Sequence, residues 1–231
     1  MKKNTKKYNF DVVFEDNHLI AVSKKSGVLC QGDKTGDKPL VDEVKEFLKE
    51  KYNKPGNVFA GLIHRLDRPV SGLVILAKTS KALTRMNEQF KTRAVQKTYW
   101  AIVKDKPLAE SGTLNHYLLK NQKQNKSKAF KKATEGALQA ELSYKIIKKL
   151  STHYLLEVSP KTGRHHQIRV QLASMSCPIK GDLKYGSKRS NPDGSISLHA
   201  RQLTFTHPVS KEEMTLVAPV PSTPIWQACK K

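Results

Sequence analysis

The sequence predicts an α+β fold in a single domain, and three observations lead to this prediction. Short apolar runs typical of strands interleave irregularly with segments of helical periodicity, unlike the repeated strand–helix–strand units of a parallel α/β protein. The chain of 231 residues is long enough to enclose one substantial core. It has no internal repeat and no long linker rich in glycine, serine or proline. We therefore expect one domain over residues 9–222, between a basic tail at 1–8 and a C-terminal tail at 223–231.

The domain is predicted to begin with a hairpin and a helix. The apolar runs DVVF and LIAV flank the turn-prone interval EDNH, which indicates a hairpin near residues 11–22. Between residues 40 and 51, apolar side chains recur at helical spacing with lysine and glutamate between them: Leu40, Val44, Phe47 and Leu48. This segment is expected to be a helix that packs one apolar face on a core.

A strand, a second helix and a further strand follow. LVILA at 73–77 has the continuous apolar composition of a buried strand. Ser80 is a candidate N-cap for the next helix, in which Leu83, Met86 and Phe90 share one face. TYWAIV at 98–103 is typical of another strand.

The second half of the domain is predicted to repeat this mixture. LQAELSYKII at 138–147 and HYLLEVS at 153–159 indicate a second hairpin. HQIRVQLASM at 166–175 is predicted to be a helix, because its apolar side chains fall on one face. HARQLTFTHP and MTLVAPVP are expected to form short closing strands punctuated by proline.

Residues 120–132 are rich in lysine and have almost nothing to bury, so we interpret them as a solvated loop or arm. A charged surface insertion and an arm that follows nucleic-acid phosphates are both compatible with this composition. Lys126 and Lys128 are the candidates for phosphate contacts.

The charge of the chain favours a polyanionic partner. Lysine and arginine number 42 against 20 acidic residues, which gives a formal net charge of +22 and a pI of about 9.9. Such values are typical of nucleic-acid binding. A membrane-surface protein would gather its basic residues on one face of an amphipathic helix, whereas here they are spread along the chain.

Nothing in the sequence directs the chain out of the cell. It contains no signal-peptide pattern and no apolar run long enough to span a bilayer. Cys30, Cys177 and Cys229 are odd in number and widely separated, as expected for reduced thiols rather than disulfides or metal ligands. We therefore expect a cytoplasmic protein without a metal site.

A first cluster of residues suited to chemistry lies just before the apolar strand at 73–77: His64, Arg65, Asp67 and Arg68. The proline and glycine that follow restrict and then free the backbone, as expected where side chains must be aimed into a cleft. Taken alone, the cluster is equally compatible with a surface turn in which the aspartate pairs with a neighbouring arginine.

A second cluster opens the helix predicted at 166–175: Arg164, His165, His166, Gln167 and Arg169. A helix N-terminus together with two guanidinium groups is suited to binding a phosphate or a carboxylate. The adjacent histidines cannot both face one metal from a helix, which disfavours a zinc site. GDLKYGSK at 181–188 is not a nucleotide-binding P-loop, because Ser187 stands where a lysine must follow Gly186.

Several motifs, in order along the chain, resemble those of the RluA family of pseudouridine synthases. HRLDRPVSGLVILAKT resembles the family's HRLD-x-x-TSGL signature, with Val70 in place of the usual threonine. QKTYWAIV resembles its K-x-Y-x-A segment, and GDLKYG resembles its GD-x-x-YG turn. TGRHHQIRVQL resembles its GR-x-HQIR-x-H-L segment, from which Gln171 departs. The opening hairpin, in which Lys25 replaces a proline, and the closing SLHARQLTFTHP extend the resemblance over residues 9–221.

This resemblance implies a pseudouridine-synthase-like catalytic domain with a mixed, largely antiparallel bent sheet, flanking helices and a central cleft. It further implies the short form of the family, without a separate N-terminal RNA-binding domain. We expect a monomer without a cofactor that isomerises uridine in structured RNA, either ribosomal or transfer RNA.

The resemblance also implies roles for individual residues. Asp67 would be the catalytic carboxylate, Arg169 its ionic partner and Tyr99 the ring that packs on the target base. Arg65 would fill the gap that the flipped uridine leaves. The remaining candidates for RNA contacts are His64, Arg68, Arg164, His166, Gln167, Lys126 and Lys128.

Two other functions compete with this interpretation. A hydrolase of N-glycosidic bonds would also use an aspartate in a basic cleft, but glycosidases usually pair two carboxylates, and the sequence places no acidic residue beside Asp67. A catalytically silent RNA-binding module would fit the composition, but it would not require Asp67, Tyr99 and Arg169 together.

Overall fold

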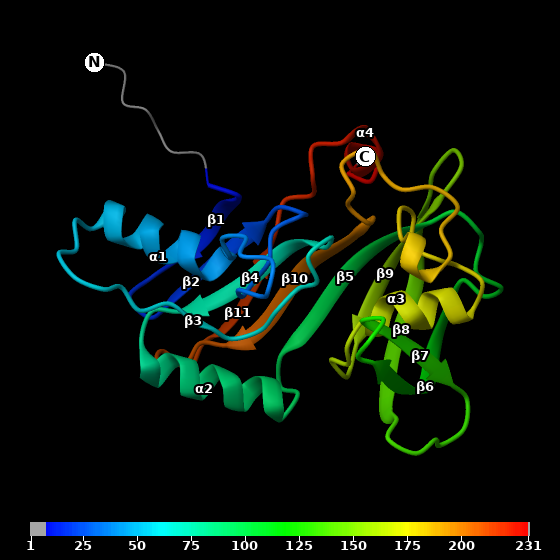
Figure 1. The fold of residues 1–231 in the computed structure, drawn as a ribbon, viewed down its shortest axis with the longest axis horizontal. Helices are drawn as coiled ribbons and strands as arrows, with labels where there is room; N and C mark the ends of the chain where they lie inside the picture. Colours follow the sequence, from blue (N-terminus) through cyan, green and yellow to red (C-terminus); the bar gives the residue numbers. More distant parts are fainter. Residues whose placement is uncertain (1–7, 231) are drawn as a thin grey trace.

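Eleven strands form one mixed sheet within residues 8–230, the part of the chain that the computed structural model describes (Figure 1). Residues 1–7 of the predicted basic tail lie outside it. In chain order the elements are β1 Phe10–Glu15, β2 Leu19–Lys24, α1 Leu40–Lys51, β3 Gly61–Leu62, β4 Ser71–Ala77, α2 Ser80–Lys91, β5 Gln96–Val103, β6 Ser111–Asn121, β7 Lys126–Phe130, β8 Leu138–Lys149, β9 Tyr154–Pro160, α3 Gln167–Ser174, the 3-10 turn η1 Leu183–Tyr185, β10 Leu198–Thr206, β11 Glu213–Val217 and α4 Pro224–Gln227.

The strand order confirms the predicted mixed, largely antiparallel sheet. The order is β1-β2-β4-β10-β5-β9-β8-β6-β7, with β3 beside β4 and β11 beside β10. β4 and β10 pair in parallel, and the other named pairs are antiparallel. In Figure 1, β10 and β5 run through the middle of the molecule, with α1 and α2 on one side and α3 on the other.

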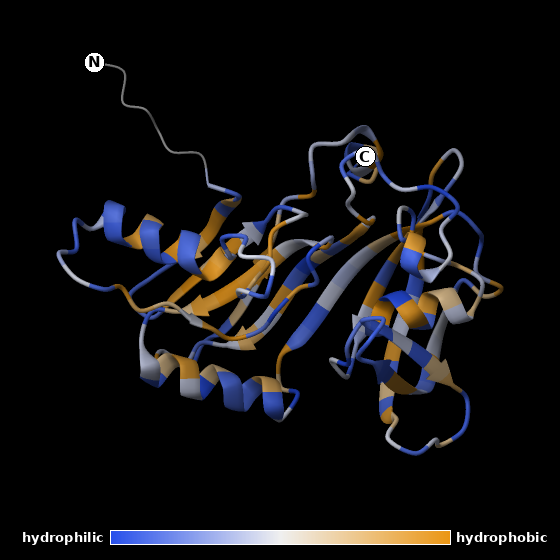
Figure 2. Ribbon diagram, viewed as in Figure 1, coloured by the Kyte–Doolittle hydropathy of each residue, from blue (hydrophilic) through white to orange (hydrophobic). Residues whose placement is uncertain are grey.

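The two N-terminal helices cover opposite faces of the sheet. Leu19 and Ala21 of β2 pack in one core cluster with Met86 of α2. Ile20 and Val22, which point to the opposite face because side chains alternate along a strand, pack in a second cluster with Val44 of α1. β2 and β4 are therefore apolar on both faces, which explains their hydrophobic colour beside the largely hydrophilic α1 in Figure 2.

The parallel junction between β4 and β10 places the loop before β4 at the centre of the sheet. Gly72 has a φ of +116°, and a Cβ there would collide with the backbone of Ala200 in β10. Only glycine meets both conditions without strain. The close approach that it allows fixes residues 63–70 above the middle strands.

Most predicted elements are present, but the predicted N-cap of the second helix and the predicted place of the HARQLTFTHP strand are wrong. The predicted hairpins are β1–β2 and β8–β9, and the helix over 40–51 is α1. The N-cap of α2 is Thr79 rather than Ser80, since the Thr79 side chain accepts a hydrogen bond from the Ala82 amide. The HARQLTFTHP segment is no short closing strand, because it forms β10, nine residues long and central in the sheet.

The lysine-rich segment, predicted to be a solvated loop or arm, lies largely within a β-hairpin. Residues 111–121 and 126–130 form β6 and β7, which pair from Tyr117 with Phe130 to Asn121 with Lys126. Lys126 and Lys128 are exposed, whereas Ser127 between them is buried. A serine on the inward face carries no apolar signal, which explains why the sequence pattern did not reveal this strand.

The segment set apart as a C-terminal tail also belongs to the packed domain. Trp226 of α4 and the following Cys229 are buried against Ile102 and Leu155 of the sheet. None of the helices within residues 8–230 is long and apolar enough to cross a membrane.

Candidate active site

Asp67 lies in the loop between β3 and β4, and neighbouring segments hold this loop through its backbone. The Leu66 amide donates to the buried Cys30 Sγ at 3.3 Å, and the Gly27 amide donates to the Arg68 carbonyl at 2.8 Å. The Asp67 side chain itself is 30% exposed. Because the backbone on both sides is fixed, the carboxylate is presented to the cleft from a rigid support.

Arg169 of α3 joins Asp67 to a second carboxylate, Asp182. Its Nε and Nη2 donate to the two Asp182 oxygens at 2.7 and 2.9 Å, and its Nη1 donates to Asp67 Oδ2 at 3.0 Å. Burial disfavours the charge of Arg169, but the hydrogen bonds and charges of Asp182 and Asp67 outweigh it and raise the Arg169 pKa further. The guanidinium is thus a fixed cation shared by both carboxylates.

His166, immediately before α3, also faces Asp67. Its Nε2 lies 3.5 Å from Asp67 Oδ2. Burial, with the charges of Arg169 and His165, lowers the pKa of His166 to about 2. The imidazole is therefore neutral at working pH, so its contact with Asp67 is not an ion pair, and at 3.5 Å it is too long for a well-formed hydrogen bond.

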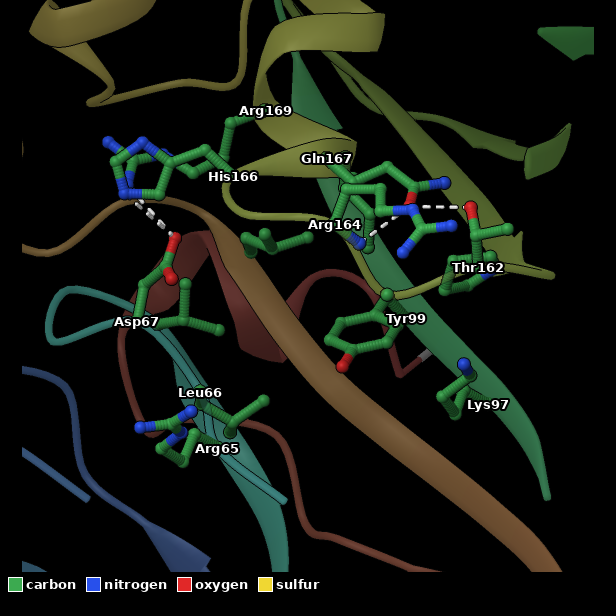
Figure 3. Close-up of a pocket in the computed structure, with 15 residues that line it drawn as sticks. Arg65, Leu66, Asp67, Lys97, Tyr99, Thr162, Arg164, His166, Gln167 and Arg169 are labelled. Atoms are coloured by element: carbon green, nitrogen blue, oxygen red, sulfur yellow. Dashed lines mark hydrogen bonds and ion pairs between the residues drawn. The ribbon is translucent and has the colours of Figure 1, made fainter. Parts of the chain in front are cut away.

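Asp67, His166 and Arg169 line a pocket of about 130 Å³ (Figure 3). Tyr99 of β5 forms part of its wall, and burial and the Asp67 charge raise the Tyr99 pKa, so the phenol stays protonated. Lys97, Arg164 and Arg65 contribute cationic groups to the lining. The pocket is small beside the roughly 300–1,000 Å³ of most ligand sites, which suits a fragment as small as one nucleobase.

Two residues of the first sequence cluster lie outside the pocket lining. His64 accepts a hydrogen bond from the Ile75 amide at 3.1 Å and stacks on Phe90, and burial lowers its pKa to about 4. Arg68 donates to the Gly27 carbonyl and pairs with Asp37 at 2.7 Å. We therefore propose that both residues hold the Asp67 loop rather than contact RNA.

Arg164 and Gln167 of the second cluster differ in how far hydrogen bonds within the protein occupy their side chains. Arg164 lines the pocket and donates to the Gln139 carbonyl at 3.0 Å. The Gln167 side-chain amide is held at both atoms, since its oxygen accepts from Thr162 Oγ1 and the Arg164 amide while its nitrogen donates to the Glu141 carbonyl. Gln167 therefore shapes the turn before α3, and Arg164 keeps guanidinium donors for a ligand.

The sequence patterns missed four residues that surround Asp67: Lys24, Lys97, Asp182 and Tyr185. Asp182 and Tyr185 lie in GDLKYG, and Lys97 lies in QKTYWAIV. These motifs supported the family resemblance, but no chemical role was derived from them. Within residues 8–230 no group of three or more histidine, cysteine or acidic residues is arranged to hold a metal ion.

Lys24, at the end of β2, stabilises the backbone beside the site. Its ammonium donates to the carbonyls of Lys25, Val28 and Arg68 at 3.0, 2.8 and 3.3 Å, and the residue is 1% exposed. Burial lowers the Lys24 pKa to about 8, although Cys30 and Asp67 partly oppose this shift. Lys24 therefore ties the Asp67 loop to the turn after β2.

This buried lysine predicts a pH dependence of stability. Between pH of about 8 and about 10.4 the unfolded chain binds the Lys24 proton more strongly than the folded one, so this group makes stability rise with pH. We expect urea unfolding to show this rise in wild type, at most roughly 1 kcal/mol per pH unit, and to lose it in Lys24→Met. Lys25→Met, which removes an exposed neighbour, is the control. Equal slopes in wild type and Lys24→Met would contradict the prediction.

Comparison with known proteins identifies relatives along most of the chain. The model of the RNA pseudouridylate synthase family matches residues 18–174. An uncharacterised RNA pseudouridine synthase of Synechocystis is 32% identical over 92% of this chain and 66% of its own length. Ribosomal large subunit pseudouridine synthase C of Vibrio cholerae is 31% identical over 90% of this chain and 65% of its own length. The chain thus spans slightly less than two thirds of these two relatives.

A shorter relative and a solved structure match over almost their whole length. The tRNA pseudouridine synthase C of Haemophilus ducreyi is 35% identical over 90% of both chains. The human RNA pseudouridylate synthase domain containing 4 superposes with a TM-score of 0.76 at 25% identity, covering 91% of this chain and 88% of that one. These matches confirm the resemblance drawn from the sequence motifs, and the chain belongs to the RNA pseudouridylate synthase family.

Proposed function

We propose that this protein is an RNA pseudouridine synthase that isomerises uridine in ribosomal or transfer RNA. The observation that carries the proposal is the Asp67 carboxylate, held by Arg169 in a small pocket with Tyr99 in its wall. The names of its relatives support the class of reaction and both classes of RNA.

In the proposed reaction, the bond between uracil N1 and the sugar C1′ breaks, the uracil turns, and C1′ rejoins it at C5. C5 loses its proton and N1 gains one, so the product is an isomer of uridine. Asp67 would engage the electron-poor sugar or base centre, as nucleophile or as base. Arg169 orients this carboxylate through the hydrogen bond from its Nη1. The chemistry requires no cofactor.

The pocket is too small for a stacked helix, so the target uridine must leave its stack and enter alone. Tyr99 would then pack against the uracil ring. Arg65 is exposed, and among residues 8–230 its side chain donates only to Gln31 Oε1, at 3.2 Å, so it can turn and fill the vacated position in the RNA. Lys97 and Arg164 would meet phosphates at the pocket.

A glycosidic hydrolase is a weaker alternative for a structural reason. Such an enzyme usually pairs its nucleophile with a carboxylic acid that donates a proton. The nearby carboxylate, Asp182, is 1% exposed and accepts two hydrogen bonds from Arg169. A carboxylate held in this way cannot reach a leaving group or donate a proton.

Asp67, Arg169 and Tyr99 meet at one site within a single chain. We propose on this ground that the enzyme works as a monomer. A cytoplasmic location is part of the same proposal, since ribosomal and transfer RNA are the expected substrates.

Mapping pseudouridine in total RNA with and without the protein tests this function and identifies the target. A strain lacking the gene is expected to lose pseudouridine at one or a few positions, and the purified protein should restore them on unmodified transcripts. A pseudouridine map unchanged by the deletion, together with no product in vitro, would exclude the proposed activity.

The β6–β7 hairpin is expected to contribute to RNA affinity. Replacing Lys126 and Lys128 by Gln removes two exposed cations, which should weaken binding about tenfold at low salt and lower the slope of log Kd against log salt by about 1.5. Lys45→Gln with Lys49→Gln on α1, at the other end of the molecule in Figure 1, is the matched control. Equal losses in both double variants would mean that the hairpin has no special role.

A further inference from the structure

Tyr185 lies between the hairpin and the active site. It is 8% exposed, and its ring is approached by the Arg169 guanidinium at 5.1 Å and by the Lys126 ammonium at 5.4 Å from the ring centroid. One cation belongs to the site and the other to the hairpin. Tyr185 therefore contacts both the active site and the β6–β7 hairpin, although it has no part in the proposed reaction.

The Tyr185 hydroxyl continues this connection through hydrogen bonds. It accepts from the Ser127 amide of β7 at 2.8 Å and lies 2.9 Å from His166 Nδ1. His166 in turn presents Nε2 to Asp67 Oδ2 at 3.5 Å. Two hydrogen-bond distances and one longer contact of 3.5 Å thus connect the hairpin backbone to the Asp67 carboxylate.

The direction of donation along this path follows from its two ends. The Ser127 amide can only donate, so the hydroxyl proton of Tyr185 is free to go to His166 Nδ1. Neutral His166 then carries its ring proton on Nε2, where it points at Asp67. The opposite tautomer would turn a lone pair toward the carboxylate and place two N–H or O–H donors against each other between Tyr185 and His166.

The backbone of His166 is bent to allow this contact. Its φ of +53° lies in the left-handed region, which costs a non-glycine residue roughly 1 kcal/mol. The neighbouring His165 ring stacks on it at 3.8 Å between centroids, and His165 is itself bound to Ser127 Oγ. The ring of His166 is therefore held between the hairpin and Asp67.

We propose that Ser127, Tyr185 and His166 form a relay by which the β6–β7 hairpin positions the catalytic carboxylate; this inference rests on the proposed function. Tyr185 and His166 are positioning residues, since they act through Asp67. The lysines of the hairpin have no ion-pair partner in the part of the chain that the structure describes: Lys120, Lys123, Lys126 and Lys128. Phosphates of bound RNA would contact these lysines and shift β7, the strand that carries Ser127. Through Tyr185 and His166, this shift would shorten the long contact between His166 and Asp67.

Tyr185→Phe tests the relay, because it keeps the ring beside Arg169 and removes only the hydroxyl. With saturating transcripts labelled with tritium at uracil C5, we expect kcat to fall about tenfold, with KM and RNA affinity unchanged within about twofold. Tyr144→Phe is the matched control, since Tyr144 is also 8% exposed and its hydroxyl makes no hydrogen bond to residues 8–230.

A double variant separates a relay from two independent effects. Asn tolerates the left-handed conformation, so His166→Asn keeps the turn and removes the ring. We expect it to lower kcat about thirtyfold, and the added Tyr185→Phe should then change kcat by less than about twofold. Multiplicative losses, or a Tyr185→Phe effect no larger than that of Tyr144→Phe, would overturn the proposal.

The tautomer of His166 gives a readout that does not depend on activity. In nitrogen-15 spectra, the imidazole signals that disappear in His166→Asn should report the Nε2–H form in wild type and move toward the Nδ1–H form in Tyr185→Phe. The Nδ1–H form in wild type would overturn the relay. If the Nε2–H form is found but no transcript is isomerised, the hydrogen-bonded path stands and the proposed function fails.

Discussion

Asp67→Asn is expected to abolish pseudouridine formation, lowering single-turnover rates by at least about a thousandfold, while RNA binding stays within about threefold of wild type. The substitution is nearly isosteric and removes the charge that must engage the electron-poor centre. Arg169 keeps its two hydrogen bonds to Asp182, so no buried cation is left unpaired. Folding should therefore be preserved to within about 1 kcal/mol.

The rate is measured by tritium release from uracil C5, and binding by filter retention of the same transcripts. Asp193→Asn is the control, because Asp193 lies on an exposed turn where it caps Ser195. Pseudouridine formation at more than about a hundredth of the wild-type rate would show that Asp67 is not the essential carboxylate. Loss of both binding and activity would instead mean that the variant has disturbed the RNA surface.

The sequence predicted the secondary structure best where one face of an element is continuously apolar. The α1 helix shows this most clearly, since the leucine and valine spacing gave its range of 40–51 as the structure has it. β7 was missed because its inward residue is Ser127, which hydrogen bonds rather than apolar packing hold in place. β10 was expected to be a short closing strand rather than a central one, because local patterns carry no information about pairing between distant strands.

Only part of the candidate site could be predicted from the sequence. The charged loop at Asp67 and the cluster at Arg169 are visible in the sequence, but their meeting joins residues 102 positions apart in the chain. Taken alone, the sequence fitted a surface turn in which Asp67 pairs with a neighbour, and it is Arg68 that pairs elsewhere, with Asp37. Asp182 escaped notice because one acidic residue in a turn has no periodicity to distinguish it.

Asp182→Asn is expected to have the second-largest effect, on both stability and rate. Asp182 is 1% exposed and neutralises a guanidinium that is itself buried. Removing one partner of such a pair leaves a poorly compensated charge and costs about 3 kcal/mol, which lowers the Tm of a domain of this size by about 6–12 °C. Asparagine can accept from Arg169 only through its amide oxygen, so Arg169 would lose one of the two bonds that fix it beside Asp67, and we expect kcat to fall about a hundredfold.

Activity must be compared at a temperature at which the Asp182→Asn variant is fully folded, so that the loss of rate is separate from the loss of stability. Asp193→Asn again serves as the control, with Tm expected within about 1 °C of wild type. A variant with a lowered Tm but normal kcat would restrict Asp182 to stabilising the fold, because Arg169 would then orient Asp67 unaided. Normal values of both would mean that the buried pair between Arg169 and Asp182 does not form in solution. We expect a loss of both stability and rate, because the Asp182 carboxylate neutralises the buried Arg169 guanidinium and also orients it beside Asp67.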